Sequence, residues 1–156
     1  RAVVTKSDKK KQIVYGCVMD SYRDGRASPD AHDDWISPSD IERTAHEYME
    51  TDRAIFVQHA RRSDAVLVES WVEPYPSESD YALAMEGKDH RAFRKMMGDD
   101  HVHSGSWCIG VRLNDELWAA FERGDINAFS PGGFGYREAM DPGELPVVKF
   151  VDIDVV

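Results

Sequence analysis

The chain has 156 residues, of which 42% are apolar and 31% are charged, and its formal net charge is −10 at pH 7. This length fits one domain with a core of its own, and no apolar run approaches the ~20 residues that a membrane helix needs. Phosphate binding favours a basic surface, so the acidic charge argues against a nucleic-acid partner.

The N-terminal residues differ in composition from the rest of the chain. Residues 1–11 are polar and rich in lysine, which predicts a flexible arm, and residues 12–156 are expected to form a single domain. The chain opens on Arg1 rather than Met and stops on the apolar run VDIDVV. Both ends are therefore expected to be cuts.

The first regular elements are a strand and a capped helix. QIVYGCVM at 12–19 predicts a strand, and an aspartate-rich loop leads from it to ISPSDIERTAHEYMET. In that segment Ser37 is expected to cap the helix, with Pro38 at its first position and Asp40 three residues after the cap. Four apolar residues then share one helical face: Ile41, Ala45, Tyr48 and Met49.

Two short β-rich runs follow the helix. AIFVQ at 54–58 and DAVLVESWV at 64–72 are separated by the five residues HARRS, which predicts an antiparallel hairpin between the two runs. Residues 73–105 are irregular, with a short helix expected over 89–97. A segment of this length favours a lid or a wall of a substrate groove.

The last third of the chain alternates again between strand and helix. SWCIGVRL at 106–113 predicts a strand, and NDELWAAFERGD predicts a helix capped by Asn114 and ended by Gly124. VVKFVDIDVV at 147–156 predicts the last strand or pair of strands. Several short strands with few helices indicate an α+β or partly open barrel fold.

Cysteines and tryptophans lie on apolar segments. Cys17 and Cys108 are interpreted as buried thiols of a protein in a reducing cytosol, not as a disulfide framework. Trp71, Trp107 and Trp118 are interpreted as core residues.

A serine beside a glycine turn is the first candidate for chemistry. Ser130 in FSPGGFG stands at a strand end, where Pro131 favours extended geometry for it and lacks the N–H that often stabilises an oxyanion. If Ser130 is a nucleophile, the oxyanion donors come from Gly132 and Gly133 or from another loop. The alternative is that Pro-Gly-Gly simply turns the chain.

Histidines provide the other candidates. His59 follows the strand AIFVQ and suits a general base, with the neighbouring Arg61 and Arg62 favouring its neutral form, although an exposed loop histidine fits equally well. His101 and His103 form an H-x-H pair among aspartates, a pattern that can bind zinc. No third ligand stands out by spacing, so no metal site and no cofactor are assigned.

The order of these pieces resembles a family. A strand ending in Gln-His, a strand VESW, the strand WCIGVRL, the helix DELWAAFERGDI and then AFSPGGF are together similar to the XkdF-like phage serine proteases. The collinear similarity runs from about Ile13 to Val156. These proteins are relatives of tailed-phage prohead maturation proteases, which resemble the herpesvirus assemblins.

The resemblance implies a fold, an activity and partners. The fold is a small, mainly antiparallel β-barrel surrounded by a few helices. The activity is cleavage of scaffold protein and of capsid-protein segments inside the immature capsid, in the host cytoplasm, often with autoprocessing. Scaffold and major capsid protein are then the substrates, a homodimer is expected, and neither nucleic acid nor membrane is a partner.

The same resemblance implies a catalytic set. Ser130 is the nucleophile and His59 the base. No histidine follows Ser130, so a third member has to be a carboxylate on the strand after it. Asp152 and Asp154 are the candidates, unless the third residue lies past Val156.

Two other functions stay open. The chain is alternatively a catalytically inactive, protease-like module that serves capsid assembly by binding scaffold. A metal-dependent hydrolase centred on His101 and His103 is the remaining hypothesis.

Overall fold

The computed structural model describes residues 2–23, 26–28, 34–51, 53–58, 60–75, 105–132 and 152–155. Its described helices are α1 (Pro38–Glu50) and α4 (Asp115–Arg123). Its described strands are β1 (Ala2–Val3), β2 (Lys6–Asp8), β3 (Ile13–Met19), β4 (Tyr22–Arg23), β5 (Arg26–Ala27), β6 (Ile55–Val57), β7 (Arg61–Arg62), β8 (Val66–Val72), β9 (Trp107–Arg112), β10 (Ala128–Gly132) and β11 (Asp152–Val155).

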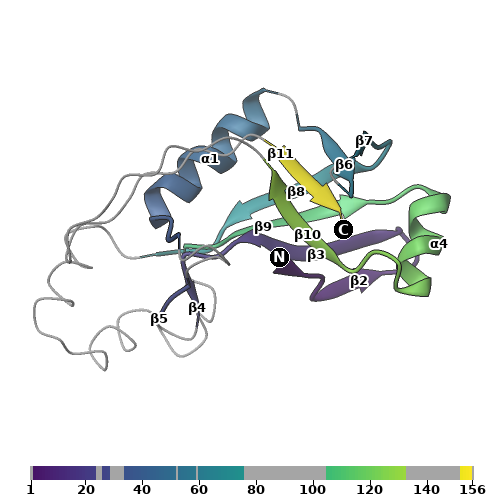
Figure 1. Cartoon of the computed structure of the whole chain (residues 1–156), viewed down its shortest axis with the longest axis horizontal. Coiled ribbons are helices and arrows are strands. Elements are labelled where there is room, and N and C mark those ends of the chain that lie inside the picture. The colour runs from purple at the N-terminus through teal and green to yellow at the C-terminus, as the bar shows by residue number, and fades with distance from the viewer. Residues whose placement is uncertain are drawn as a thin grey trace, which may run out of the picture.

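These strands form two main sheets (Figure 1). Sheet A has the order β1-β10-β11-β6-β7, and sheet B has the order β2-β3-β9-β8, while β4 and β5 form a separate pair. The described pairs are antiparallel except for β11 and β6, which run parallel. The arrangement confirms the α+β class; closure into an assemblin-like barrel stays a prediction.

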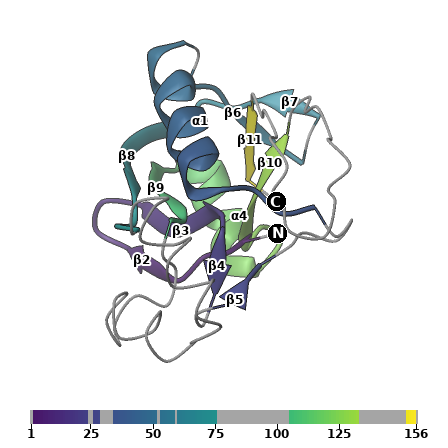
Figure 2. The same ribbon diagram turned by 90° about the vertical axis from the view of Figure 1, so that its left-hand side faces the viewer.

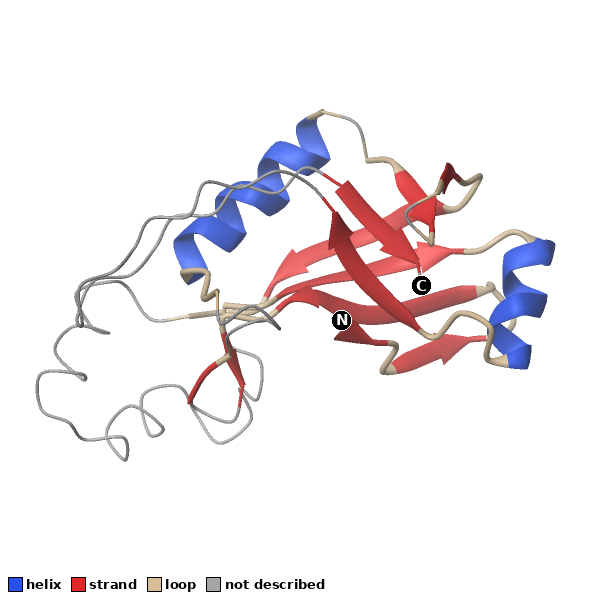
Figure 3. Cartoon of the chain, in the orientation of Figure 1, coloured by secondary structure: helices blue, strands red, loops and turns tan. Residues whose placement is uncertain are grey.

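The helices cover different parts of the strands (Figure 3). α1 lies along one side, and α4 lies at one end of the molecule, beyond the β2–β3 hairpin. In Figure 2, viewed from the other end, α1 is in front and α4 lies behind it. Both sheets and both helices contribute to one buried apolar cluster, which includes Val14, Ile41, Ile55, Trp107, Ile109, Val111, Leu117 and Phe129.

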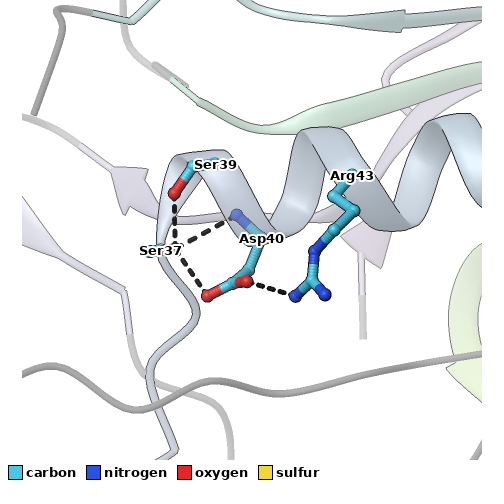
Figure 4. Close-up of polar contacts among 4 residues, drawn as sticks. All are labelled: Ser37, Ser39, Asp40 and Arg43. Atoms are coloured by element: carbon cyan, nitrogen blue, oxygen red, sulfur yellow. Dashed lines mark hydrogen bonds and ion pairs between the residues drawn. The ribbon is translucent and has the colours of Figure 1, made fainter.

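The start of α1 is fixed by side-chain hydrogen bonds, as the sequence predicts (Figure 4). The Asp40 backbone N–H donates to Ser37 Oγ at 3.1 Å, and the Ser37 hydroxyl donates to Asp40 Oδ2 at 2.7 Å. Pro38 stands in the first turn, and Arg43 forms an ion pair with Asp40. Ile41, Ala45 and Tyr48 are buried, so the predicted apolar face is confirmed.

The ends of α4 also follow the prediction. The Leu117 N–H donates to Asn114 Oδ1 at 2.9 Å, which satisfies one of the first free donors of the helix. Gly124 ends the helix with φ +80°, a left-handed conformation that glycine adopts without steric cost.

The N-terminal residues differ from the expected flexible arm. β1 pairs with β10, and β2 pairs with β3, so both N-terminal strands are integrated into the sheets. Lys9 also forms an ion pair with Glu122 of α4, with Nζ and Oε1 2.7 Å apart. Composition alone predicted an arm because polar residues on an edge strand and in a disordered tail look the same.

The predicted hairpin between residues 54–58 and 64–72 is wrong. β6 turns back at once on β7, with the Ala60 N–H donating to the Val57 carbonyl at 3.0 Å. The N–H and the hydroxyl of Ser63 both donate to the Ile55 carbonyl at 2.8 Å, which closes this short hairpin. The chain then leaves sheet A, and β8 pairs with β9 in sheet B.

Trp107 and Trp118 are core residues, but the same interpretation of Trp71 is wrong. Trp71 is 38% exposed, and its Nε1–H donates to Glu73 at 2.7 Å. The cause is an irregularity in β8, where the register with β9 shifts between Leu67 and Glu69. Such a bulge reverses the alternation of side chains, so Trp71 falls on the outer face of sheet B.

The interpretation of the two cysteines as thiols is also wrong. Cys17 of β3 and Cys108 of β9 lie directly opposite each other and form a disulfide. The two cysteines are 91 residues apart in the sequence, and only the register of β3 and β9 brings them together, so no local pattern predicted the disulfide.

Several predictions fall outside the described residues. They are the helix at 89–97 with the lid around it, the H-x-H pair His101 and His103, and the part of the last strand at 147–151.

Candidate active site

Ser130 lies on β10, which sheet A holds between β1 and β11. The preceding residue, Phe129, is fully buried in the core. Successive residues of a strand face opposite sides, so Ser130 lies on the face of sheet A that points away from the core. Its side chain is partly exposed.

The ladder between β10 and β11 sets what lies beside the serine. Ser130 is opposite Asp154, Pro131 is opposite Ile153 and Gly132 is opposite Asp152. Pro131 has no N–H, so its pair with Ile153 must be of the type without mutual hydrogen bonds. The flanking pairs are then the hydrogen-bonded ones, with Cα atoms about 5.5 Å apart in each.

Both candidate aspartate positions consequently share a face with the serine. Directly opposite positions of an antiparallel pair lie on the same face, and positions two apart on one strand do so as well. Asp154 is the position across from Ser130, and Asp152 is two residues before it. The register therefore places residue 130 and the two aspartate positions in one small area of sheet A.

The same ladder explains how β10 accommodates Pro131. The Val4 N–H donates to the Asn127 carbonyl at 2.9 Å, and β1 continues only as far as the pair Ala2 and Phe129. By alternation the main chain of Pro131 faces the side of β1, beyond Ala2, the first residue of that strand. A missing N–H costs little there, because it interrupts no pairing with β11.

Of the two predicted oxyanion donors, Gly132 lies within the described residues. The N–H of Gly132 faces β11 and belongs to the hydrogen-bonded pair with Asp152. This N–H is therefore used by the pairing of β10 with β11 and is not free to hold an oxyanion. Gly133 lies outside the described residues.

The strand β6 connects this area with the predicted base. β6 runs parallel to β11, and Phe56 is the position beside Asp154. Ser130, Asp154 and Phe56 thus form a row across three neighbouring strands. The chain continues from Val57 through Gln58 to His59, which lies outside the described residues.

The basic turn after β6 has partners in other elements. Arg62 is the position opposite Phe56, at the edge of sheet A. Arg61 forms an ion pair with Glu116 of α4, at 3.1 Å between Nη2 and Oε1. The positive charge of Arg61 is therefore partly compensated by a carboxylate.

In the described part of the chain, no group of three or more His, Cys, Asp or Glu residues is placed to hold a metal ion. No helix among these residues is long and apolar enough to span a bilayer.

Phe56 is a residue of this area that the sequence interpretation did not single out. Its buried neighbour Ile55 faces the core, so strand alternation already indicates that Phe56 faces the other way. Its place beside Asp154 depends on the parallel pairing of β6 and β11, for which the sequence holds no local signal.

Comparison with known proteins identifies the family. Residues 2–138 match the family model described as "Putative phage serine protease XkdF". The chain therefore belongs to this phage protein family. The matched residues include Ser130 and His59 and end before Asp152.

Two relatives are known from Bacillus subtilis (strain 168). The phage-like element PBSX protein XkdF is 30% identical over 131 residues, which cover 83% of this chain and 39% of the relative. The uncharacterized protein YqbD is 25% identical over 146 residues, covering 93% of this chain and 38% of the relative. The chain thus spans less than two-fifths of the length of either protein. No solved structure matches the chain.

Proposed function

We propose that this chain is a serine endopeptidase that cleaves peptide bonds by acyl transfer, with Ser130 as the nucleophile. The observation that carries the proposal is the row across sheet A: Ser130 opposite Asp154, and Asp154 beside the strand that leads to His59. Membership in a family described as phage serine proteases supports it.

The mechanism uses three groups in the usual division of roles. His59 takes the proton of Ser130 as Oγ attacks the carbonyl carbon of the scissile peptide bond. The C–N bond then breaks, and His59 returns the proton to the leaving amine. Water repeats the sequence on the acyl-enzyme, which releases the second product and restores the serine.

A carboxylate orients the imidazole in this proposal, and Asp154 is the preferred candidate over Asp152. Asp154 lies between Ser130 and β6 in the row, whereas Asp152 lies two residues further from the end of β6 that continues to His59. For the oxyanion, the N–H of Gly133 is preferred to that of Gly132, whose N–H faces β11.

The proposed substrates are the scaffold protein and segments of the major capsid protein, cleaved during maturation of the prohead. The family description and the name of the relative, a protein of a phage-like element, support a phage setting. Location inside the immature capsid in the host cytoplasm, homodimer formation and autoprocessing belong to the same proposal.

Labelling with a fluorophosphonate tests the nucleophile without a known substrate. These reagents phosphonylate only activated serines, so the wild type should gain one adduct, located on Ser130 by peptide mass spectrometry. Ser130→Ala should gain none. Ser7→Ala is the matched control, because Ser7 is exposed on β2, and this variant should be labelled like the wild type.

Co-expression with the scaffold protein of the same phage tests the substrate. Wild type and Ser7→Ala should cleave the scaffold, and Ser130→Ala should leave it intact while keeping a cooperative melting transition. Cleavage by Ser130→Ala would overturn the role of Ser130. A folded wild type that neither takes the label nor cleaves scaffold would favour the inactive assembly module.

A further inference from the structure

Phe56 is an aromatic residue of sheet A that takes no part in the apolar core. Its neighbours on β6, Ile55 and Val57, pack in or against the core cluster, and Phe56 does not belong to it. The ring is partly exposed. The register places this aromatic residue on the outer face of the sheet, beside the candidate catalytic positions.

Its position relative to the serine is given by the register. Phe56 is beside Asp154, which is opposite Ser130, so two strand spacings separate Phe56 from the nucleophile. Strands lie about 4.8 Å apart, which puts the Cα atoms of Phe56 and Ser130 about 10 Å apart on the same face. A peptide whose scissile carbonyl lies at Ser130 can reach Phe56 with a side chain one or two residues away.

The positions around Phe56 carry residues of both charges. Positions 152 and 154, both aspartates, lie on the same face between Phe56 and the serine strand. Arg62 is the position on the other side of Phe56, so residues of both charges stand at the neighbouring positions and charge selects no class of substrate there. An apolar side chain of the substrate needs no charged partner and gains contact with the ring.

We infer that Phe56 is a specificity-determining residue, an apolar wall that binds an apolar side chain within two residues of the scissile bond. The inference rests on the proposed function, because it takes Ser130 as the attacking group. It assigns a substrate class, peptides that are apolar beside the cleavage site, to a residue outside the catalytic set.

Two fluorophosphonate probes with the same reactive group test this assignment. One carries an octyl chain and the other an oligo(ethylene glycol) chain of equal length. The two probes therefore differ in the polarity of the chain attached to phosphorus and not in the reactive group. The wild type should react faster with the octyl probe. Phe56→Ala should lower the octyl-to-glycol rate ratio by about tenfold, roughly the effect of two methylene groups.

Further variants separate specificity from folding. Phe56→Leu keeps an apolar side chain and should retain most of the preference for the octyl probe. Phe56→Thr removes the ring but keeps a residue that favours strands, so it replaces Phe56→Ala if that variant does not fold. Phe121→Ala, which removes a partly buried ring on α4, should melt earlier without any change in the rate ratio.

The outcomes distinguish this inference from the proposed function. If neither probe labels the wild type at Ser130, the proposed function fails, and the inference fails with it. If both probes label Ser130 and the rate ratio is the same in the wild type, Phe56→Ala and Phe56→Thr, only the specificity role is overturned. A uniform loss of both rates, with an unchanged ratio, likewise assigns Phe56 a structural role.

Discussion

Gly110 lies in the middle of β9, where residues of two neighbouring strands approach its backbone from the outer face of sheet B. A Cβ atom added there would lie 2.8 Å from Tyr15 Cε1 and 3.2 Å from Glu69 Cβ. The Tyr15 hydroxyl crosses above the glycine and donates to Glu69 Oε1 at 3.0 Å, and Lys6 Nζ lies 5.3 Å from the ring centre. The absence of a side chain at Gly110 thus permits a contact that links β3 to β8.

We expect Gly110→Ala to lower the free energy of unfolding by about 1–3 kcal/mol, because the added methyl group has to displace the Tyr15 ring. Gly124→Ala is the control. No atom would lie within 4 Å of its added Cβ, so its cost is only that of a left-handed alanine, about 1–2 kcal/mol. Urea unfolding gives both values. Only Gly110→Ala should also change the titration of Tyr15, and an unchanged titration would contradict the steric explanation.

The hydrogen bond to Glu69 raises the pKa of Tyr15 above its ordinary value, with smaller contributions from desolvation and from the charges of Glu69 and Asp8. A raised folded-state pKa means that this stabilising contribution is complete below about pH 10. It is lost as the pH rises through the folded pKa. Glu69→Gln should therefore lower the pKa of Tyr15, measured by NMR of ring-labelled tyrosine. Glu116→Gln, on α4, should leave it unchanged.

At the scale of elements, short helices and strands are held by caps and by a few side-chain bridges. α4 has nine residues, and three contacts tie it to neighbouring loops and strands. They are Lys9 with Glu122, Gln12 with Asp115 and Arg61 with Glu116. These contacts are exposed to solvent, so each contributes little to stability by itself. The buried side chains of Leu117 and Trp118 attach the helix to the core.

The N-terminal cap of α1 offers the clearest test of an element. Ser37→Ala should cost about 1 kcal/mol of unfolding free energy, because the Asp40 N–H loses its acceptor. Ser37→Asn should restore most of it, since asparagine is also a good cap and adds no charge beside the Asp40 carboxylate. Thermal unfolding followed by circular dichroism measures both. Equal stability of wild type and Ser37→Ala would show that the Ser37 cap does not contribute to the free energy of unfolding.

At the scale of the whole molecule, the disulfide joins β3 and β9 in the middle of sheet B. No disulfide links sheet A to it, and the two sheets are joined by the shared core and by chain connections such as that from β1 to β2. The candidate active site on sheet A therefore depends on the packing of the two sheets. Changes in sheet B are expected to affect the site through stability rather than through direct contact.

Reduction of the disulfide should destabilise the chain, by up to about 4–5 kcal/mol on the loop-entropy estimate for a closed loop of this size. The double variant Cys17→Ala with Cys108→Ala should melt at the same lowered temperature with and without reductant, whereas the wild type should respond to reductant. Mass spectrometry after alkylation under denaturing, non-reducing conditions should find no free thiol. Two alkylated cysteines there would contradict the pairing.

Part of the fold could be predicted because its signals are local. Ser37 and Asn114 cap their helices, and Gly124 ends the second one, since each acts on backbone groups within a few residues. For the candidate site, the sequence predicted individual residues but not which of them lie side by side. Ser130 stood out by its place before Pro-Gly-Gly, and the aspartates stood out by their place on the last strand.

What the sequence by itself determined is therefore the α+β class, the helix boundaries and the residue types that chemistry would use. Tertiary structure alone decided the neighbours: the disulfide between Cys17 and Cys108, the outward position of Trp71, and the row of Ser130, Asp154 and Phe56. The physical reason is that strand pairing is set by contacts between distant segments, and a single bulge or a change of sheet moves every side chain that follows. Local patterns report which face a residue prefers, and only the register reports which residue lies across from it.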